Sequence, residues 1–96
     1  MIASEWLDEL ARRIAERDPA IDCSRPEPGS LTLARGARGA IVLERGKEIV
    51  VTPTQAGGTT LASRLTDRVT YGDAQPFPCE PSSIDRAFDA IIAHFG

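Results

Sequence analysis

The chain has 96 residues, of which 42% are hydrophobic and 26% charged, and its net charge at pH 7 is −3. This length suits one ordinary domain, and the composition argues against wholesale disorder. The longest uninterrupted apolar stretches are only a few residues, whereas a membrane-spanning helix needs about 20. The first residues lack the basic start and apolar run of a signal peptide. We therefore expect a single soluble domain, 1–96, located in the cytoplasm.

The first predicted element is an amphipathic helix from Ser4 to about Arg17. Ser4 is a candidate N-cap, because its hydroxyl can accept a hydrogen bond from a free backbone N–H. Pro19 ends the helix, because proline disfavours the α conformation in the residue before it. The apolar residues recur at helical spacing and form one stripe, made of Trp6, Leu7, Leu10 and Ile14.

In the middle of the chain the hydrophobic period changes from 3.6 towards 2. Residues 31–33 predict a short strand after a link rich in proline and glycine. Residues 40–44 and 48–52 predict a β-hairpin, in which Gly46 supplies the positive φ that such a turn commonly requires.

The length of the hairpin loop decides which residues share a face of the sheet. A loop of odd length would place Ile41, Leu43, Ile49 and Val51 together, whereas a two-residue loop would divide them. We therefore expect an odd-length loop, with the helices covering that face. The opposite face would then hold Ala40, Val42 and Val50 and would be partly apolar.

Residues 64–71 fit either a strand or a helix, and their β-branched residues favour a strand. A final helix is predicted over residues 83–95, capped by Ser82 or Ser83. Its broad apolar face consists of Ile84, Ala87, Phe88, Ile91, Ile92 and Phe95. The predicted fold is α+β: an N-terminal helix, an antiparallel sheet of three or four strands and a C-terminal helix, with both helices packed on one sheet face.

Charge is distributed unevenly along the chain. Both ends are acidic, whereas residues 24–72 carry seven basic side chains and four acidic ones. The basic residues are Arg25, Arg35, Arg38, Arg45, Lys47, Arg64 and Arg68. The acidic residues are Glu27, Glu44, Glu48 and Asp67. Arginine suits phosphate contacts, and a nest of backbone N–H groups at Gly57, Gly58 and Thr59 could bind an anion. Aromatic residues for base stacking are few. Acidic helices could equally complement a basic sheet within the fold or across a dimer.

No motif in the sequence predicts catalysis, a metal site or a cofactor. A structural zinc site uses four cysteine or histidine ligands in paired spacings, which this chain lacks. His94, the one histidine, lies near the end of the last helix, where the helix dipole favours a positive charge. Cys23 and Cys79 are expected to be reduced in a cytoplasmic protein, and a bond between them is the alternative.

These features favour a non-enzymatic interaction module of the accessory, adaptor or inhibitor type, acting through an exposed sheet face. The expected surface contains Ala40, Val42 and Val50, framed by Arg38, Arg45, Arg64 and Arg68. Its expected partner is another protein or a second copy of the chain. The alternative function is binding of an anionic ligand or nucleic acid through the arginines and the Gly57–Gly58 loop.

Overall fold

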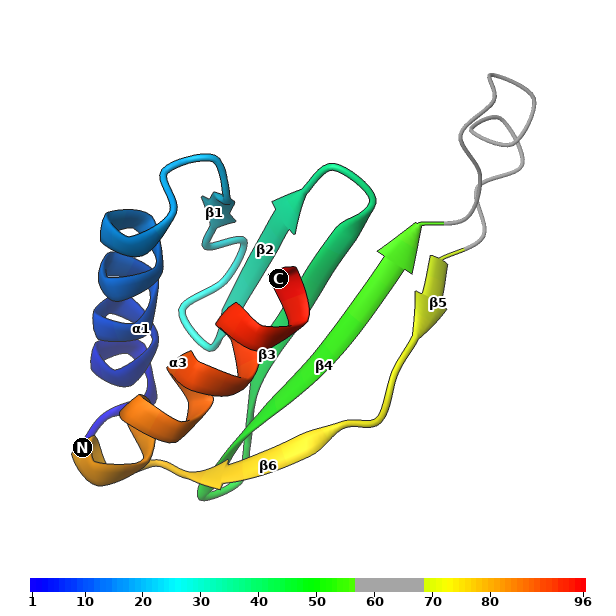
Figure 1. Ribbon diagram of the computed structural model, residues 1–96. Helices are drawn as coiled ribbons and strands as arrows, with labels where there is room; N and C mark the ends of the chain where they lie inside the picture. The colour runs from blue at the N-terminus through cyan, green and yellow to red at the C-terminus, as the bar shows by residue number, and fades with distance from the viewer. Residues whose placement is uncertain (57–68) are drawn as a thin grey trace.

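The structure is a computed structural model that describes residues 1–56 and 69–96. In the described part of the chain, six antiparallel strands come between an N-terminal and a C-terminal helix (Figure 1). In chain order the elements are α1 (Ala3–Arg17), β1 (Asp22–Ser24), β2 (Ser30–Arg35), β3 (Arg38–Arg45), β4 (Glu48–Ala56), β5 (Val69–Tyr71), β6 (Gln75–Pro78) and α3 (Pro81–Phe95). The α+β class is as predicted, but the sheet has more strands than the three or four expected. The sequence analysis missed β1, which has three residues, and β6, which has two prolines among four residues.

The sheet follows the order β1-β2-β3-β4-β5, and β6 pairs with β4 on the same edge as β5. β6 pairs with Glu48–Val51 and β5 pairs with Thr54–Ala56. Pro53 lies in β4 where the neighbour changes from β6 to β5, and its carbonyl accepts a hydrogen bond from Gly72 N–H at 2.8 Å. Proline is tolerated in β4 at this point because no residue of β5 or β6 is paired with it.

Both edges of the sheet are poorly suited to pairing with another strand. Cys79 N–H donates to the carbonyl of Lys47, so by alternation the N–H groups of Phe77 and Gln75 also point towards β4. Pro76 and Pro78 therefore point outwards and offer no N–H donors to an incoming strand. The opposite edge is formed by the short β1.

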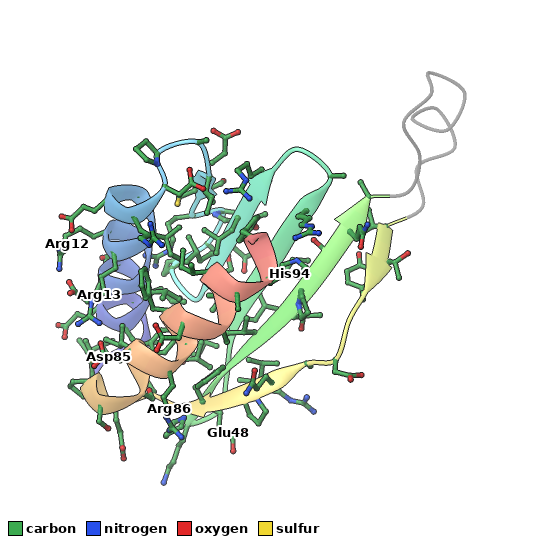
Figure 2. All side chains as sticks on the ribbon, in the orientation of Figure 1. Arg12, Arg13, Glu48, Asp85, Arg86 and His94 are labelled. Carbon is green, nitrogen blue, oxygen red and sulfur yellow. The ribbon has the colours of Figure 1, made fainter. Side chains whose placement is uncertain are left out.

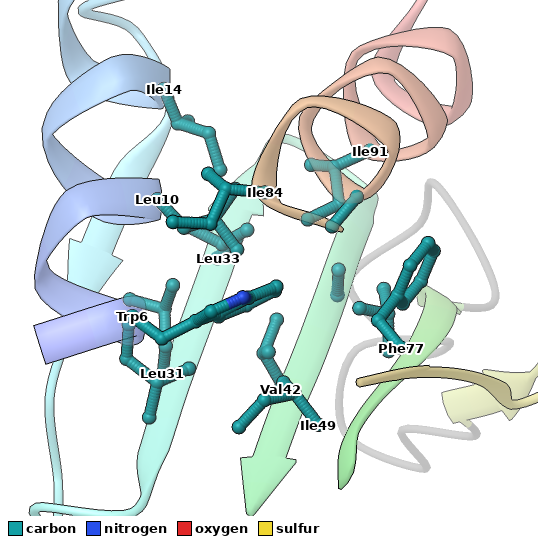
Figure 3. Packing of buried hydrophobic residues seen from close by; sticks show 14 of the residues in the cluster. Trp6, Leu10, Ile14, Leu31, Leu33, Val42, Ile49, Phe77, Ile84 and Ile91 are labelled. Atoms are coloured by element: carbon teal, nitrogen blue, oxygen red, sulfur yellow. The ribbon is translucent and has the colours of Figure 1, made fainter. Parts of the chain in front are cut away.

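Both helices cover the same face of the sheet (Figure 1). Their apolar stripes and the inward side chains of the strands form one buried cluster (Figure 3). Trp6 from α1 lies in this cluster with Leu31, Val42, Ile84 and other side chains, all fully or almost fully buried. No helix among residues 1–56 and 69–96 is long and apolar enough to cross a membrane.

The start of α3 is fastened by a buried hydrogen-bond network rather than by a hydroxyl cap. Trp6 Nε1 donates to Ser83 Oγ and to the carbonyl of Glu80, each at 3.1 Å. Ser83 Oγ in turn lies 2.9 Å from the carbonyl of Glu80. The expected serine cap is wrong, because the helix begins at Pro81 with Glu80 at the N-cap. Proline suits this first helical position because it has no N–H to leave unbonded.

The N-terminal helix also begins earlier than predicted. Its first residue is Ala3 and its N-cap residue is Ile2, which makes no side-chain cap. Ser4 therefore lies inside the helix, and its predicted capping role is wrong.

The β3–β4 turn has two residues, Gly46 and Lys47, so the expected odd-length loop is wrong. Gly46 has a φ of 63° at the first turn position, as in the two-residue turns that follow the right-handed twist of a hairpin. The resulting register pairs Val42 with Val51. The residues that the odd register placed together are therefore divided between the two faces: Ile49 and Val51 face the helices, and Ile41 and Leu43 face away.

Candidate interaction surface

The face of the sheet that no described helix covers carries several apolar side chains. Ile41 and Leu43 of β3 share this helix-free face with Val50 of β4, because Leu43 is paired with Val50 and Ile41 with Thr52. Leu43 is 46% exposed, whereas Ile41 and Val50 are half-buried. Towards the other end of the face, Tyr71 of β5 is 61% exposed. Isolated exposed apolar residues are normal, but a group on one face indicates a contact surface.

The helix-free face has a hollow of about 260 Å³ beside Gly39. Ala34 of β2 and Thr54 of β4 flank this glycine in the sheet, and Ile41 and Tyr71 also line the hollow. A β-carbon at Gly39 would lie 2.6 Å from Thr54 Oγ1 and 2.8 Å from the carbonyl oxygen of Leu33. Glycine is therefore required there, because Thr54 and the Leu33 carbonyl leave no room for a side chain.

The structure divides the predicted apolar surface. Val50 lies on the helix-free face, as expected. Ala40 and Val42 do not: they are only 1% and 0% exposed and belong to the core beneath the helices. Their predicted exposure is wrong because the two-residue turn shifts the register by one residue relative to an odd loop, which moves each side chain to the opposite face.

Two of the arginines bind the C-terminal end of α3. The Arg38 guanidinium donates to the carbonyl of His94 at 3.0 Å. Arg35 donates to the carbonyl of Phe95, pairs with Asp18 and lies 5.7 Å from the centre of the Phe95 ring. Cations suit a helix C-terminus, where carbonyls lack backbone partners. The position of Arg38 at the rim of the predicted surface is therefore wrong, because it lies on the helix-covered face.

The remaining predicted binding residues have different outcomes. Arg45 lies at the end of β3 and is exposed, opposite Glu48 in the strand register. Arg25 donates to the carbonyls of Ser30 and Pro28 and pairs with Asp8 of α1. The other predicted residues lie outside the described part of the chain: Arg64, Arg68, Gly57, Gly58 and Thr59.

Ion pairs are concentrated on the helix layer. Arg13 of α1 bonds Glu9 in its own helix and Asp85 in α3, which joins the two helices (Figure 2). Arg12 bonds Glu9 and Glu16. Hydrogen bonds from Arg12 and Arg13 lower the pKa of Glu9 to about 2. Among the described residues between the two helices, only Arg25 and Arg35 pair with acidic residues at α1, which are Asp8 and Asp18. These two contacts support the alternative interpretation, in which acidic helices complement a basic sheet within the fold.

His94 and the two cysteines each lie next to backbone carbonyl groups of the fold. His94 points from α3 towards the sheet (Figure 2), and its Nε2 lies 2.9 Å from the carbonyl of Gly39 and 3.2 Å from that of Thr54. Cys23 is next to Ala11 and Cys79 is next to Met1, and both are unbonded. Met1 and Ala11 are ten residues apart in a largely helical segment, which corresponds to roughly 15 Å. The two cysteines beside them are therefore too far apart for a disulfide. Burial, followed by the charge of Asp22, raises the pKa of the Cys23 thiol.

Sequence reasoning missed Leu43, Ile41 and Gly39 as surface features, although a signal was present. Both hairpin turns read Arg-Gly-X, and both glycines, Gly36 and Gly46, have φ near +60°. Glycine at the first of two turn positions is typical of a tight hairpin turn. Applied to both turns, that rule gives the observed register and the correct face for each side chain.

The interpretation of this surface depends on its own chemistry, because no protein family, no curated protein and no solved structure matches this chain. Among the described residues, no group of three or more histidine, cysteine or acidic side chains is arranged to hold a metal ion.

Proposed function

We propose that this chain is a non-enzymatic interaction module that binds a protein through the helix-free face of its sheet. The observation that carries the proposal is the exposure of Leu43 and Tyr71 on that face. Burying such side chains in a complex contributes roughly 25 cal/mol for each Å² of apolar surface removed from water. The core already contains its own apolar side chains, so these exposed ones contribute little to folding and are suited to binding.

The surroundings of the face support an apolar partner surface rather than a phosphate. The charged groups on this face are at its margin: Asp22 in β1, and Arg45 and Glu48 at the β3–β4 turn. The interior of the face holds threonine, alanine and aliphatic side chains. The alternative, binding of an anionic ligand or nucleic acid, loses support because Arg25, Arg35 and Arg38 are engaged within the fold.

The proposal locates the module in the cytoplasm. Its support is the pair of unbonded cysteines, whose positions are too far apart for a disulfide. A cytoplasmic protein has no need of a disulfide bond. The Trp6–Ser83 hydrogen bond and the hydrophobic core hold the helices and strands together instead.

The experiment is affinity purification from cells that express the chain, with two matched variants. Leu43→Glu places a carboxylate on the helix-free face, and Ala93→Glu places one on an exposed position of α3. We expect the unchanged chain and Ala93→Glu to retain the same partner, and Leu43→Glu to lose it while its circular dichroism spectrum stays unchanged. Retention of the same proteins by all three chains would overturn the proposal.

A further inference from the structure

We propose that the partner of the helix-free face is a second copy of this chain, in a two-fold symmetric, face-to-face dimer centred on Ile41. This inference rests on the proposed function, because it names the partner of the same surface. The argument follows from the size of the face, its distribution of charge and its self-complementary shape.

The size of the face fits another sheet better than a helix or a peptide. With strands about 4.8 Å apart and a rise of about 3.3 Å per residue, the residues of the six strands give a footprint of roughly 500 Å². Side-chain relief raises the accessible area towards the roughly 800 Å² per partner that stable interfaces bury. A helix about 10 Å wide would cover only about half of the face.

Charge directs self-association to this face. Each chain has a net charge of −3, and both helices carry exposed acidic side chains, such as Glu5 and Asp89. Contact between two helix layers would bring those carboxylates together, which is unfavourable. The interior of the helix-free face is uncharged, so two such faces can meet without repulsion. The strand edges are weak alternatives, because Pro76 and Pro78 block the β6 part of one edge, and β5 and β1 have only three residues each.

Shape makes the face complementary to itself. A two-fold interface requires that each feature meets its counterpart in the partner. Leu43 projects from β3, and the hollow beside Gly39 is lined by the same strand, about 13 Å away at 3.3 Å per residue. Ile41 is midway between them. A two-fold axis beside Ile41, lying in the interface and perpendicular to β3, places Leu43 of each copy in the hollow of the other.

The same two-fold axis also determines which other side chains of the two copies face each other. Pro76 is level with Leu43 and Val50 in the sheet, and Tyr71 is level with Gly39 and Thr54. Rotation about the axis exchanges these two levels. Tyr71 therefore faces the partner's Pro76, and Val50 faces the partner's Thr54. Arg45 and Glu48 of the turn fall opposite the level of the partner's Ala37 and Ala56, which brings no like charges together.

The first experiment is sedimentation equilibrium of the purified chain from about 1 µM to about 500 µM, a range that covers the affinities of modest dimers. We expect the average mass to rise from 10.3 kDa towards twice that value. Leu43→Glu should weaken the dimer roughly a hundredfold or more, because it would bury an unpaired carboxylate, and Ala93→Glu should leave it unchanged. A native chain that stays monomeric at the highest concentration overturns the dimer.

The second experiment tests the reciprocal contact. Ala34→Lys places an ammonium group beside the hollow, opposite Leu43 of the other copy. Leu43→Glu and Ala34→Lys should each be monomeric alone. An equimolar mixture should recover a heterodimer, since the introduced carboxylate of one chain then meets the introduced ammonium group of the other and the second contact is native. A native dimer with no recovery in the mixture overturns the arrangement about Ile41. Loss of the dimer with retention of another partner through Leu43 leaves the proposed function standing and removes this inference alone.

Discussion

The two faces of the sheet differ sharply although they share every strand. Val42 and Leu43 are consecutive in β3, yet Val42 is fully buried beneath the helices and Leu43 is nearly half exposed. The helix-covered face also holds the buried Trp6–Ser83 hydrogen bond and the contacts of Arg35 and Arg38 with α3. The comparison teaches that the contacts which stabilise the fold lie on the covered face, and that the helix-free face is the one we propose for binding.

The largest difference in the free energy of unfolding is expected between substitutions at Val42 and at Leu43. Val42→Asp would bury an unpaired carboxylate in the core and should lower the free energy of unfolding by about 4 kcal/mol or more. Leu43→Asp should change it by less than about 0.5 kcal/mol, because the new group stays in water. Urea denaturation at low protein concentration measures both. Equal destabilisation by the two variants would contradict the assignment of the faces.

A smaller effect is expected at the buried network of the covered face. Ser83→Ala removes the hydroxyl that accepts from Trp6 Nε1, and the remaining bond to Glu80 limits the loss. We expect the free energy of unfolding to fall by about 1–2 kcal/mol. Ser82→Ala, at the exposed neighbouring position, is the matched control and should be neutral. Thermal unfolding followed by tryptophan fluorescence compares them.

The arginine contacts at the end of α3 should contribute less. Arg35→Ala removes the pairing with Asp18 and the bond to the carbonyl of Phe95, and should cost about 1 kcal/mol since the groups are only partly buried. Arg45→Ala, on the helix-free face beside the turn, should be silent in the same melting experiment. A larger loss at Arg45 than at Arg35 would reverse the role given to the two arginines.

The smallest effect concerns pH. The pKa of Glu9 is lowered from 4.5 to about 2 by Arg12 and Arg13, so its ion pairs stabilise the fold above the ordinary pKa and are lost as pH falls through that interval. Glu9→Gln should therefore reduce the decline in melting temperature between about pH 4.5 and about pH 2. Glu5→Gln, in the same helix but outside these ion pairs, is the matched control. An unaltered acid profile in Glu9→Gln would show that the ion pairs contribute nothing.

Much of the fold could be predicted because helical stripes such as Trp6 to Ile14 repeat often enough to fix the element and its buried face. The strand faces could not be assigned as securely, because Ile41, Val42, Leu43 and their neighbours form a nearly continuous apolar run. In such a run the period of two is weak, and only the turn geometry at Gly36 and Gly46 decides the register.

The candidate site could be predicted at the level of a face rather than of residues. Reasoning that two helices cover one face of a small sheet gave an apolar face open to a partner, and Val50 lies on it. Arg38 was misplaced for a different reason. Its contact with the carbonyl of His94 spans 56 residues of sequence, and no local pattern encodes a contact that depends on where α3 ends.

The central claim, one face for the core and the other for binding, is tested most directly by methyl NMR with a water-soluble paramagnetic probe. In dilute protein the methyl signals of Leu43 should broaden strongly and those of Val42 should not. At high concentration, or with the partner bound, Leu43 should become protected while Val42 stays unchanged. Protection of Leu43 in the dilute monomer, or its continued exposure when the partner is bound, would contradict the account.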